Sequence, residues 1–404
     1  MHANQGSGQN LGNKPSALTT PFGLFPAIFA LALGGLFIGT GEFASMSLLP
    51  DLSEGTHVSV PKAGAYISAY AIGVVLGSPV IAILGARWSR RRLLAALLAI
   101  FTLGYIASAL AAAFPTLIAA RFLAGLPHGA YYGVASLCAA AIVPPARRAS
   151  AIGYVMLGLA AANLLGVPAA TWVGDHFGWR AVFGCVGAGG VLTALLIKTF
   201  VPHIPADKSS SPLSELSALG RGQVWLTLLT AAIGFGGMFA VYSYITPTLT
   251  DVAGFSDRSV PGVLAVWGLG MVAGNIVGGW LADRALIPSI FGMLAWNVVF
   301  LAVFTVASPH KGYALLVLFL VGNGFALVPA LQSRLMNVAG KAQTLAASLN
   351  HSAFNVANAL GAALGGAAIA AGHGYASTGV VGAGLALVGT VPMIASVALR
   401  ASRQ

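Results

Sequence analysis

A series of apolar stretches, each about 20 residues long, runs along nearly the whole sequence. A helix of this length crosses hydrocarbon with its backbone hydrogen bonds satisfied internally, whereas a membrane barrel would show short alternating segments. Of the 404 residues, 57% are hydrophobic and 7% are charged, and the mean hydropathy is +0.87. No water-soluble domain of this length has such a composition. The sequence therefore predicts an all-α polytopic membrane protein.

Length and hydropathy predict twelve transmembrane helices. The spans are 23–49, 63–85, 92–113, 115–142, 150–173, 180–201, 223–249, 260–282, 287–307, 312–334, 343–370 and 375–398. The longest break, 202–222, contains three prolines and several charges, which is typical of a linker. We therefore expect a disordered cytoplasmic tail (1–22), a six-helix bundle (23–201), the cytoplasmic linker (202–222), a second six-helix bundle (223–398) and a cytoplasmic tail (399–404).

The formal net charge of +11 indicates topology rather than a nucleic-acid surface. Counting spans from the N-terminus puts most basic residues on one side, which the positive-inside bias assigns to the cytoplasm. These residues are Lys14, Arg87, Arg90, Arg91, Arg92, Arg147, Arg148, Lys198, Lys208, Arg221, Arg284, Arg334, Lys341, Arg400 and Arg403. We expect a multi-pass protein of a bacterial plasma membrane, with both termini cytoplasmic and the lipid bilayer as its main partner.

Short internal matches indicate that the two halves are repeats of each other. The stretch 71–77, followed by Arg87, matches 268–274, followed by Arg284, at an offset of 197 residues. Phe122-Leu-Ala-Gly125 matches Phe319-Leu-Val-Gly322 at the same offset, and Ala162-Asn-Leu-Leu-Gly166 matches Ala357-Asn-Ala-Leu-Gly361 at 195. Three matches nearly in register favour two pseudo-symmetric bundles.

The loop after the predicted eighth span carries a recognisable motif, Gly279-Trp-Leu-Ala-Asp283-Arg284. It fits the loop signature G-x-L-a-D-R, and with the duplicated halves it resembles the major facilitator superfamily. The resemblance implies a substrate path between the bundles and a cytoplasmic loop latch. The latch candidates are Arg87, Arg91, Asp283 and Arg284. In the first half Ala82 and Ala86 stand where the family usually has Gly and Asp, which puts that half's latch in question.

Further landmarks resemble the proton-coupled drug and sugar efflux branch of this superfamily. They are Gly41-Glu-Phe43 with Leu48-Leu-Pro-Asp51, Arg121 with His128-Gly129, Gly166-Val-Pro168, Gly178-Trp-Arg180 and Tyr242-Ser-Tyr-Ile-Thr-Pro247. Gly166 and Pro168 belong to a span-five helix-packing motif, although Val167 separates residues that the family usually has adjacent. Gly361 and Gly365 are expected to permit close helix approach on span eleven.

Glu42 lies inside an apolar span, where an ionised carboxylate is costly unless it is paired, hydrated or protonated. It lies roughly 12 Å from the outer end of span one, and Arg121 reaches a similar depth on span four, at about 1.5 Å per residue. His128 follows Arg121 by two helical turns. We predict that Glu42, Arg121 and His128 couple transport to protons; the alternative is a static buried ion bridge with a satisfied histidine.

Polar side chains elsewhere in the spans are candidates for substrate binding. They are Tyr66, Tyr70, Asn163, Tyr242, Tyr244, Asn323, His351 and Asn355. The alternatives are an interfacial belt for the tyrosines and hydrogen bonds between helices for the asparagines and His351.

The sequence has no Walker motif, metal-ligand cluster or nucleophile-base arrangement. We therefore expect no enzyme and no cofactor, with a proton gradient as the energy source. The prediction is a monomeric secondary active transporter that exports a small organic solute, either a sugar, a sugar-like compound or an amphipathic drug, in exchange for protons. The alternatives are an importer or facilitator on the same fold, a non-transporting receptor and a channel.

Overall fold

The computed structural model describes residues 21–205 and 211–401, and within these ranges all regular structure is helical. Most of the predicted N-terminal tail, part of the linker and the last three residues lie outside the described residues, so the predicted tails and domain boundaries stay predictions.

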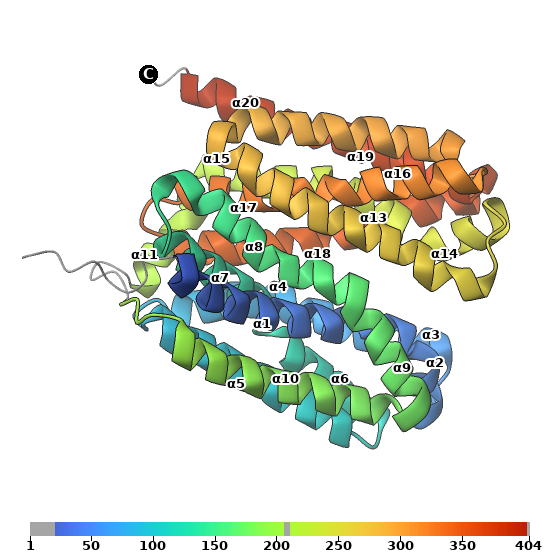
Figure 1. Cartoon of the computed structure of the whole chain (residues 1–404), viewed down its shortest axis with the longest axis horizontal. Coiled ribbons are helices and arrows are strands. Elements are labelled where there is room, and N and C mark those ends of the chain that lie inside the picture. Colours follow the sequence, from blue (N-terminus) through green and yellow to red (C-terminus); the bar gives the residue numbers. More distant parts are fainter. Residues whose placement is uncertain (1–20, 206–210, 402–404) are drawn as a thin grey trace, which may run out of the picture.

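The helices before the linker form one group in Figure 1, and those after it form a second group. The helices that build the first group are α1 (Pro21–Ser47), α4 (Ala65–Leu84), α5 (Arg90–Leu110), α6 (Phe114–Gly125), α7 (His128–Ala141), α8 (Arg148–Ala161), α9 (Val167–Phe177) and α10 (Trp179–Phe200). Those of the second are α12 (Gly222–Leu229), α13 (Gly236–Tyr242), α15 (Val260–Ala307), α16 (Lys311–Asn323), α17 (Leu327–Val338), α18 (Gln343–Ala368), α19 (Thr378–Val388) and α20 (Thr390–Ala401).

Short helices lie at the two ends of the molecule. They are α2 (Leu49–Gly55), α3 (Val60–Ala63), α11 (Pro212–Leu216) and α14 (Ile245–Pro247). Figure 1 shows α11 at one end, with α2, α3 and α14 at the other. We call the end that holds α11 the linker end, and the end that holds α2, α3 and α14 the far end.

Ten helical segments in the described residues are long and apolar enough to span a membrane. Two breaks reconcile this number with the twelve predicted spans. Ala285, at φ −152° and ψ 80°, divides the 48-residue α15 into two arms, which run back along each other in Figure 1. The fourth predicted span is divided into α6 and α7 at Pro127, which cannot donate a backbone hydrogen bond.

The two groups meet closely at the linker end, where glycines bring backbones together. Gly133 on α7 faces the backbone and hydroxyl of Ser348 on α18, and Gly279 on α15 faces the backbone at Ala149 and Ser150. A side chain at either glycine would need one helix to move away. The two groups are therefore in direct contact at the linker end.

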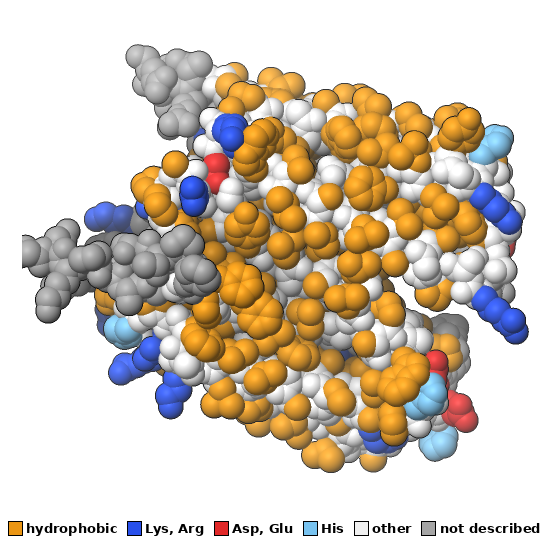
Figure 2. Space-filling model, viewed as in Figure 1, with side chains coloured by type: hydrophobic (Ala, Val, Ile, Leu, Met, Phe, Trp, Pro, Cys, Tyr) orange, Lys and Arg blue, Asp and Glu red, His pale blue; other side chains and the backbone are white. Residues whose placement is uncertain are grey.

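Apolar side chains cover the flanks of the molecule, while charged side chains gather at its two ends (Figure 2). Leu84, Leu110 and Val306 are each at least 70% exposed, which water would disfavour. The band between the charged ends matches a hydrocarbon environment, so the chain is a multi-pass membrane protein.

Candidate functional site

Four polar side chains from four helices of the first group meet near the middle of the molecule: Glu42, Tyr70, Arg121 and His128. His128 Nδ1, at the start of α7, lies 3.8 Å from Glu42 Oε2 on α1. The Tyr70 hydroxyl on α4 forms a 3.0 Å hydrogen bond with the same histidine nitrogen. The structure thus brings Glu42, His128 and Tyr70 together, although the sequence suggested Arg121 as the partner of Glu42.

Arg121, on α6, binds the backbone beside Glu42. Its guanidinium donates to the Tyr105 hydroxyl at 3.2 Å and to the Gly41 carbonyl at 3.3 Å. It also lies over the ring of Tyr70, 4.6 Å from the centroid. Within the described residues, no ion pair of 4.0 Å or less joins Arg121 to Glu42. Arg121 therefore reaches the residue next to Glu42, but aromatic rings and a carbonyl hold its guanidinium.

A second histidine enters the cluster from the other group of helices. His351, on α18, stacks on the Tyr132 ring with centroids 4.2 Å apart and planes 12° apart. Its ring lies 5.5 Å from that of His128. Tyr132 is fixed in turn because its hydroxyl donates to the Gly35 carbonyl at 2.7 Å. His351 Nε2 is buried and has no hydrogen-bond partner among the described residues.

A cavity lies between the two groups beside this cluster. Its polar lining consists of Glu42, His128, His351, Asn355 and Asn358. The remaining lining is aromatic or aliphatic: Phe43, Leu159, Phe235, Phe239, Phe325, Val328 and Phe354. One carboxylate therefore faces a space lined by five phenylalanine rings, two aliphatic side chains and four other polar side chains.

A second cavity adjoins the first and shares Phe43, Phe239 and Phe325 with it. Its other lining residues are Asn163, Met238, Tyr242, Trp267 and Met271. The Tyr242 hydroxyl donates to Asn163 Oδ1 at 3.0 Å, which bridges the two groups of helices. The two cavities form one candidate binding region with aromatic walls and a few amides.

Three of the predicted substrate-binding residues lie away from these cavities. The Tyr66 hydroxyl is hydrogen-bonded to Thr56 at 2.7 Å within the first group. Tyr244 donates to the Ala362 carbonyl at 2.8 Å, and Asn323 packs its backbone against Gly274. Each of these contacts lies within one group of helices. Tyr70, Asn163, Tyr242, His351 and Asn355 are the candidates that lie in or against the cavity region.

Sequence reasoning missed the apolar walls because it searched the spans for polar side chains. Phe235 and Phe239 are four residues apart and so share a helix face, and Phe354 follows His351 by three positions. This spacing was a usable signal. It is also typical of ordinary core packing, so sequence alone does not separate the two.

The predicted helix-packing residues lie at close helix contacts. Gly166 ends a π-helical turn (Ala162–Gly166) against Thr40 on α1, and Pro168 lies in the first turn of α9. Gly361 faces the backbone of Gly236 and Ala240, and Gly365 faces Tyr244. The π-turn already departs from the regular α-helical hydrogen-bond spacing, and a proline in the first turn of a helix lacks only an N–H that would have no partner within that helix. The span therefore tolerates both.

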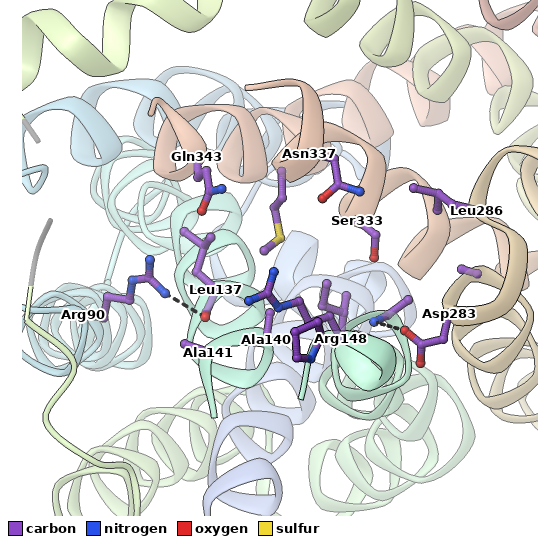
Figure 3. A pocket seen from close by; sticks show the side chains of 15 residues that line it. Arg90, Leu137, Ala140, Ala141, Arg148, Asp283, Leu286, Ser333, Asn337 and Gln343 are labelled. Carbon is purple, nitrogen blue, oxygen red and sulfur yellow. Dashed lines mark hydrogen bonds between the residues drawn. The ribbon is translucent and has the colours of Figure 1, made fainter. Parts of the chain in front are cut away.

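One predicted latch residue, Asp283, lines a polar cavity of about 400 Å³ at the linker end (Figure 3). Asp283 accepts hydrogen bonds from the backbone nitrogens of Ala149, at 2.7 Å, and Ser150, at 2.9 Å. Arg284 stacks on Trp280, with its guanidinium 3.5 Å from the ring centroid.

The two first-half latch candidates make no such contact between the groups of helices. Arg91 donates to the carbonyls of Lys198 and Val201, which belong to its own group, and Arg87 is exposed. Of the four latch candidates, Asp283 is therefore the one seen to join the two groups.

Two groups of helices around a central polar-and-aromatic region, embedded in an apolar surface, define a membrane transporter of small solutes and not an enzyme. A family model described as Major Facilitator Superfamily matches residues 31–345, and the chain belongs to this family.

The chain is similar to the inner membrane transport protein YdhP of Escherichia coli K12, with 42% identity over 89% of this chain and 94% of that protein. It is also similar to a chloramphenicol resistance protein of Streptomyces lividans, with 32% identity over 91% of this chain and 95% of that protein. Among solved structures, the human organic anion transporter MFSD10 superposes with a TM-score of 0.76 at 15% identity, covering 92% of this chain and 99% of that one. The last similarity concerns the fold alone.

Proposed function

We propose that this transporter exports a small organic solute in exchange for protons by alternating access, with the linker end in the cytoplasm. The observation that carries the proposal is the position of Glu42, whose carboxylate lines the cavity between the two groups of helices and lies 3.8 Å from His128. An ionisable group at this depth is expensive to maintain, which favours a functional role.

Glu42 is the proposed proton carrier. Protonation from the far end neutralises the carboxylate and removes the cost of enclosing a charge when the far end closes. Opening of the linker end then exposes Glu42 to the cytoplasm, where proton release accompanies solute binding. Arg121 supplies a fixed positive charge beside the Gly41 carbonyl, and His128, whose Nδ1 is hydrogen-bonded to the Tyr70 hydroxyl, is placed to exchange a proton with Glu42.

The lining supports an amphipathic, ring-containing solute as cargo. Phe43, Phe239 and Phe325 are shared by both cavities and offer ring faces, whereas the polar groups are three amides, two histidines, one tyrosine and one carboxylate. The similarity to a protein named for chloramphenicol resistance agrees with such a cargo. A sugar remains the second candidate because Asn163, Asn355 and Asn358 provide hydrogen-bond donors and acceptors for hydroxyl groups.

Orientation and energy source complete the proposal. The linker end carries most of the basic side chains, which favours the cytoplasm. The transporter works as a monomer without a cofactor, since the binding region is built from one chain and the proton gradient supplies the free energy.

Transport by purified protein in proteoliposomes under an imposed pH gradient tests the proposal. Amphipathic drugs and sugars are supplied in parallel, and both solute flux and internal pH are recorded. Solute export that stops when an ionophore collapses the gradient supports antiport. Accumulation in the opposite direction would identify an importer, and gradient-independent flux a facilitator; either result would overturn the proposal.

A further inference from the structure

The linker end contains a contact in which an acid of one group of helices caps a helix of the other group. Both carboxylate oxygens of Asp283, which lies at the end of the first arm of α15, bind backbone N–H groups at the start of α8, those of Ala149 and Ser150. The first N–H groups of a helix lack intrahelical partners, and the helix dipole favours a negative charge there. Asp283 therefore ties the second group to α8 of the first (Figure 3).

The internal repeat predicts an equivalent contact in the other half, between the first-half loop and the start of α18. This chain cannot make that contact in the same way. At the offset of 197 that relates these loops, Asp283 corresponds to Ala86. At the offset of 195 that relates α8 to α18, Ala149 and Ser150 correspond to Thr344 and Leu345. The methyl group of Ala86 cannot accept a hydrogen bond, so the start of α18 needs another acceptor.

That acceptor comes from the linker. Glu215, on the short helix α11, accepts a hydrogen bond from the Leu345 backbone nitrogen through Oε2 at 2.9 Å. Thr344 contributes hydrogen bonds from both its backbone and its side chain. Glu215 thus binds the repeat counterparts of the two residues that Asp283 binds. It is 1% exposed, which is unusual for a glutamate on a linker.

The local sequence stabilises the short helix that carries Glu215. Ser211 and Ser214 form a reciprocal capping box, and Pro212 occupies the first turn of α11. The helix packs against α4 of the first group and α18 of the second. A carboxylate on α11 therefore acts across the boundary between the groups although it belongs to neither.

We infer that Glu215 is a positioning residue that replaces the acid missing at Ala86 and holds α18 against the first group when the linker end is closed. The linker is then one half of a two-part latch, with Asp283 as the other half. The inference rests on the proposed function in one respect, since alternating access is what requires the latch to open in each cycle.

The separation of the two groups at the linker end provides a direct test. Ala141, on α7, and Asn337, on α17, are exposed and line the linker-end cavity from opposite groups (Figure 3). Spin labels at Ala141→Cys and Asn337→Cys, with Cys138→Ala and Cys185→Ser, report this separation by double electron–electron resonance. Glu215→Ala is expected to increase the more widely separated population about tenfold relative to the unmodified latch, because it leaves the buried Leu345 N–H without its hydrogen-bond acceptor.

Three further variants make the test specific. Ala86→Asp combined with Glu215→Ala restores an acid at the repeat position and is expected to return the population toward its original value. Glu215→Gln keeps an acceptor oxygen and is expected to change the population less than Glu215→Ala does. Glu54→Ala removes the same charge from an exposed position on α2 and is expected to change nothing.

The results separate the latch from the transport proposal because the distance measurement needs no substrate. An unchanged distribution in Glu215→Ala, an equal shift in Glu54→Ala, or failure of Ala86→Asp to restore closure would each overturn the inference. If Glu215→Ala does not fold, Glu215→Gln is compared with the parent over a range of pH. A closed population that both proteins lose equally at high pH would overturn the inference. If Glu215→Ala shifts the distances but the parent protein shows no proton-coupled export, the inference about the latch stands and the proposed function is wrong.

Discussion

His351 and Tyr132 join the two groups of helices through a parallel ring stack, with centroids 4.2 Å apart. Tyr132 is anchored to the Gly35 carbonyl of α1, while His351 faces the cavity that also contains Glu42. The stack thus connects the proposed proton carrier of the first group to the wall supplied by the second. A change of separation between the groups must break or slide this contact.

Replacing His351 tests whether the stack or the imidazole matters. His351→Phe keeps a flat ring and is expected to retain most substrate affinity, whereas His351→Ala is expected to weaken binding about tenfold, the size of one lost aromatic contact with its buried area. Equilibrium binding of the transported solute to purified protein measures both. Equal affinities for His351→Ala and the parent would contradict a binding role, and a loss in both variants would assign the role to the ring nitrogens.

Glu42→Gln is expected to abolish proton-coupled export while the protein remains folded, because the amide cannot carry a proton. Gradient-driven flux and proton release on solute binding are the measurements. Glu54→Gln, on the exposed face of α2, is the matched control and is expected to transport normally. Full gradient-driven export by Glu42→Gln would remove the carboxylate from the mechanism.

Arg121→Leu separates folding from coupling. The repeat counterpart of Arg121 is Leu318, so the fold accommodates an apolar side chain at that place. The substitution removes the hydrogen bonds to Tyr105 and the Gly41 carbonyl, and we expect folded protein with at least about a hundredfold loss of coupled transport. Arg121→Lys is expected to restore activity only partly, because an ammonium lacks the fork that reaches both oxygens. Wild-type flux in Arg121→Leu would show the charge to be structural.

Phe239→Ala distinguishes the two cargo classes. Phe239 lines both cavities, so loss of its ring is expected to reduce affinity for a ring-containing solute about tenfold and to affect a sugar much less. Competition binding with one compound of each class measures the ratio. A larger effect on the sugar would favour the sugar as cargo.

The linker-end latch is expected to depend on pH through Glu215. Burial raises the pKa of Glu215 above its ordinary value, and this effect exceeds the lowering by its hydrogen bonds to Leu345 and Thr344 and by the charge of Arg90. Of the elements packed against α11, α4 has no charged residue, and α18 contributes only His351, which faces the cavity between the groups.

The sign follows from the comparison with a released, exposed carboxyl group, whose pKa is about 4.3. The latched carboxyl binds its proton more tightly, so closure is fully stabilised below that ordinary value and weakens as the pH rises through the raised pKa. The spin-label distances described above, recorded between about pH 4 and pH 9, are expected to show the separated population rising with pH. Glu215→Gln removes this dependence, and a population that instead rises on acidification would contradict the assignment.

The positions of the spans followed from sequence because a helix must supply about 20 apolar residues wherever it meets hydrocarbon. The break at Pro127 was missed, since a proline in the middle of an apolar run changes neither length nor hydropathy. The duplicated halves and the depth of Glu42 and Arg121 were also readable, because both depend on spacing along single helices.

Which side chains actually meet was decided by the tertiary structure. Glu42 faces His128 instead of Arg121, since neighbouring helices at equal depth still differ in rotation about their axes. The contact between Glu215 and Leu345 joins residues 130 positions apart, and sequence showed only that the acid at Ala86 was missing. Hydropathy and spacing are properties of one helix, and they determined the class of protein. Partners across helices depend on how the two groups pack, and that packing completed both the binding region and the latch.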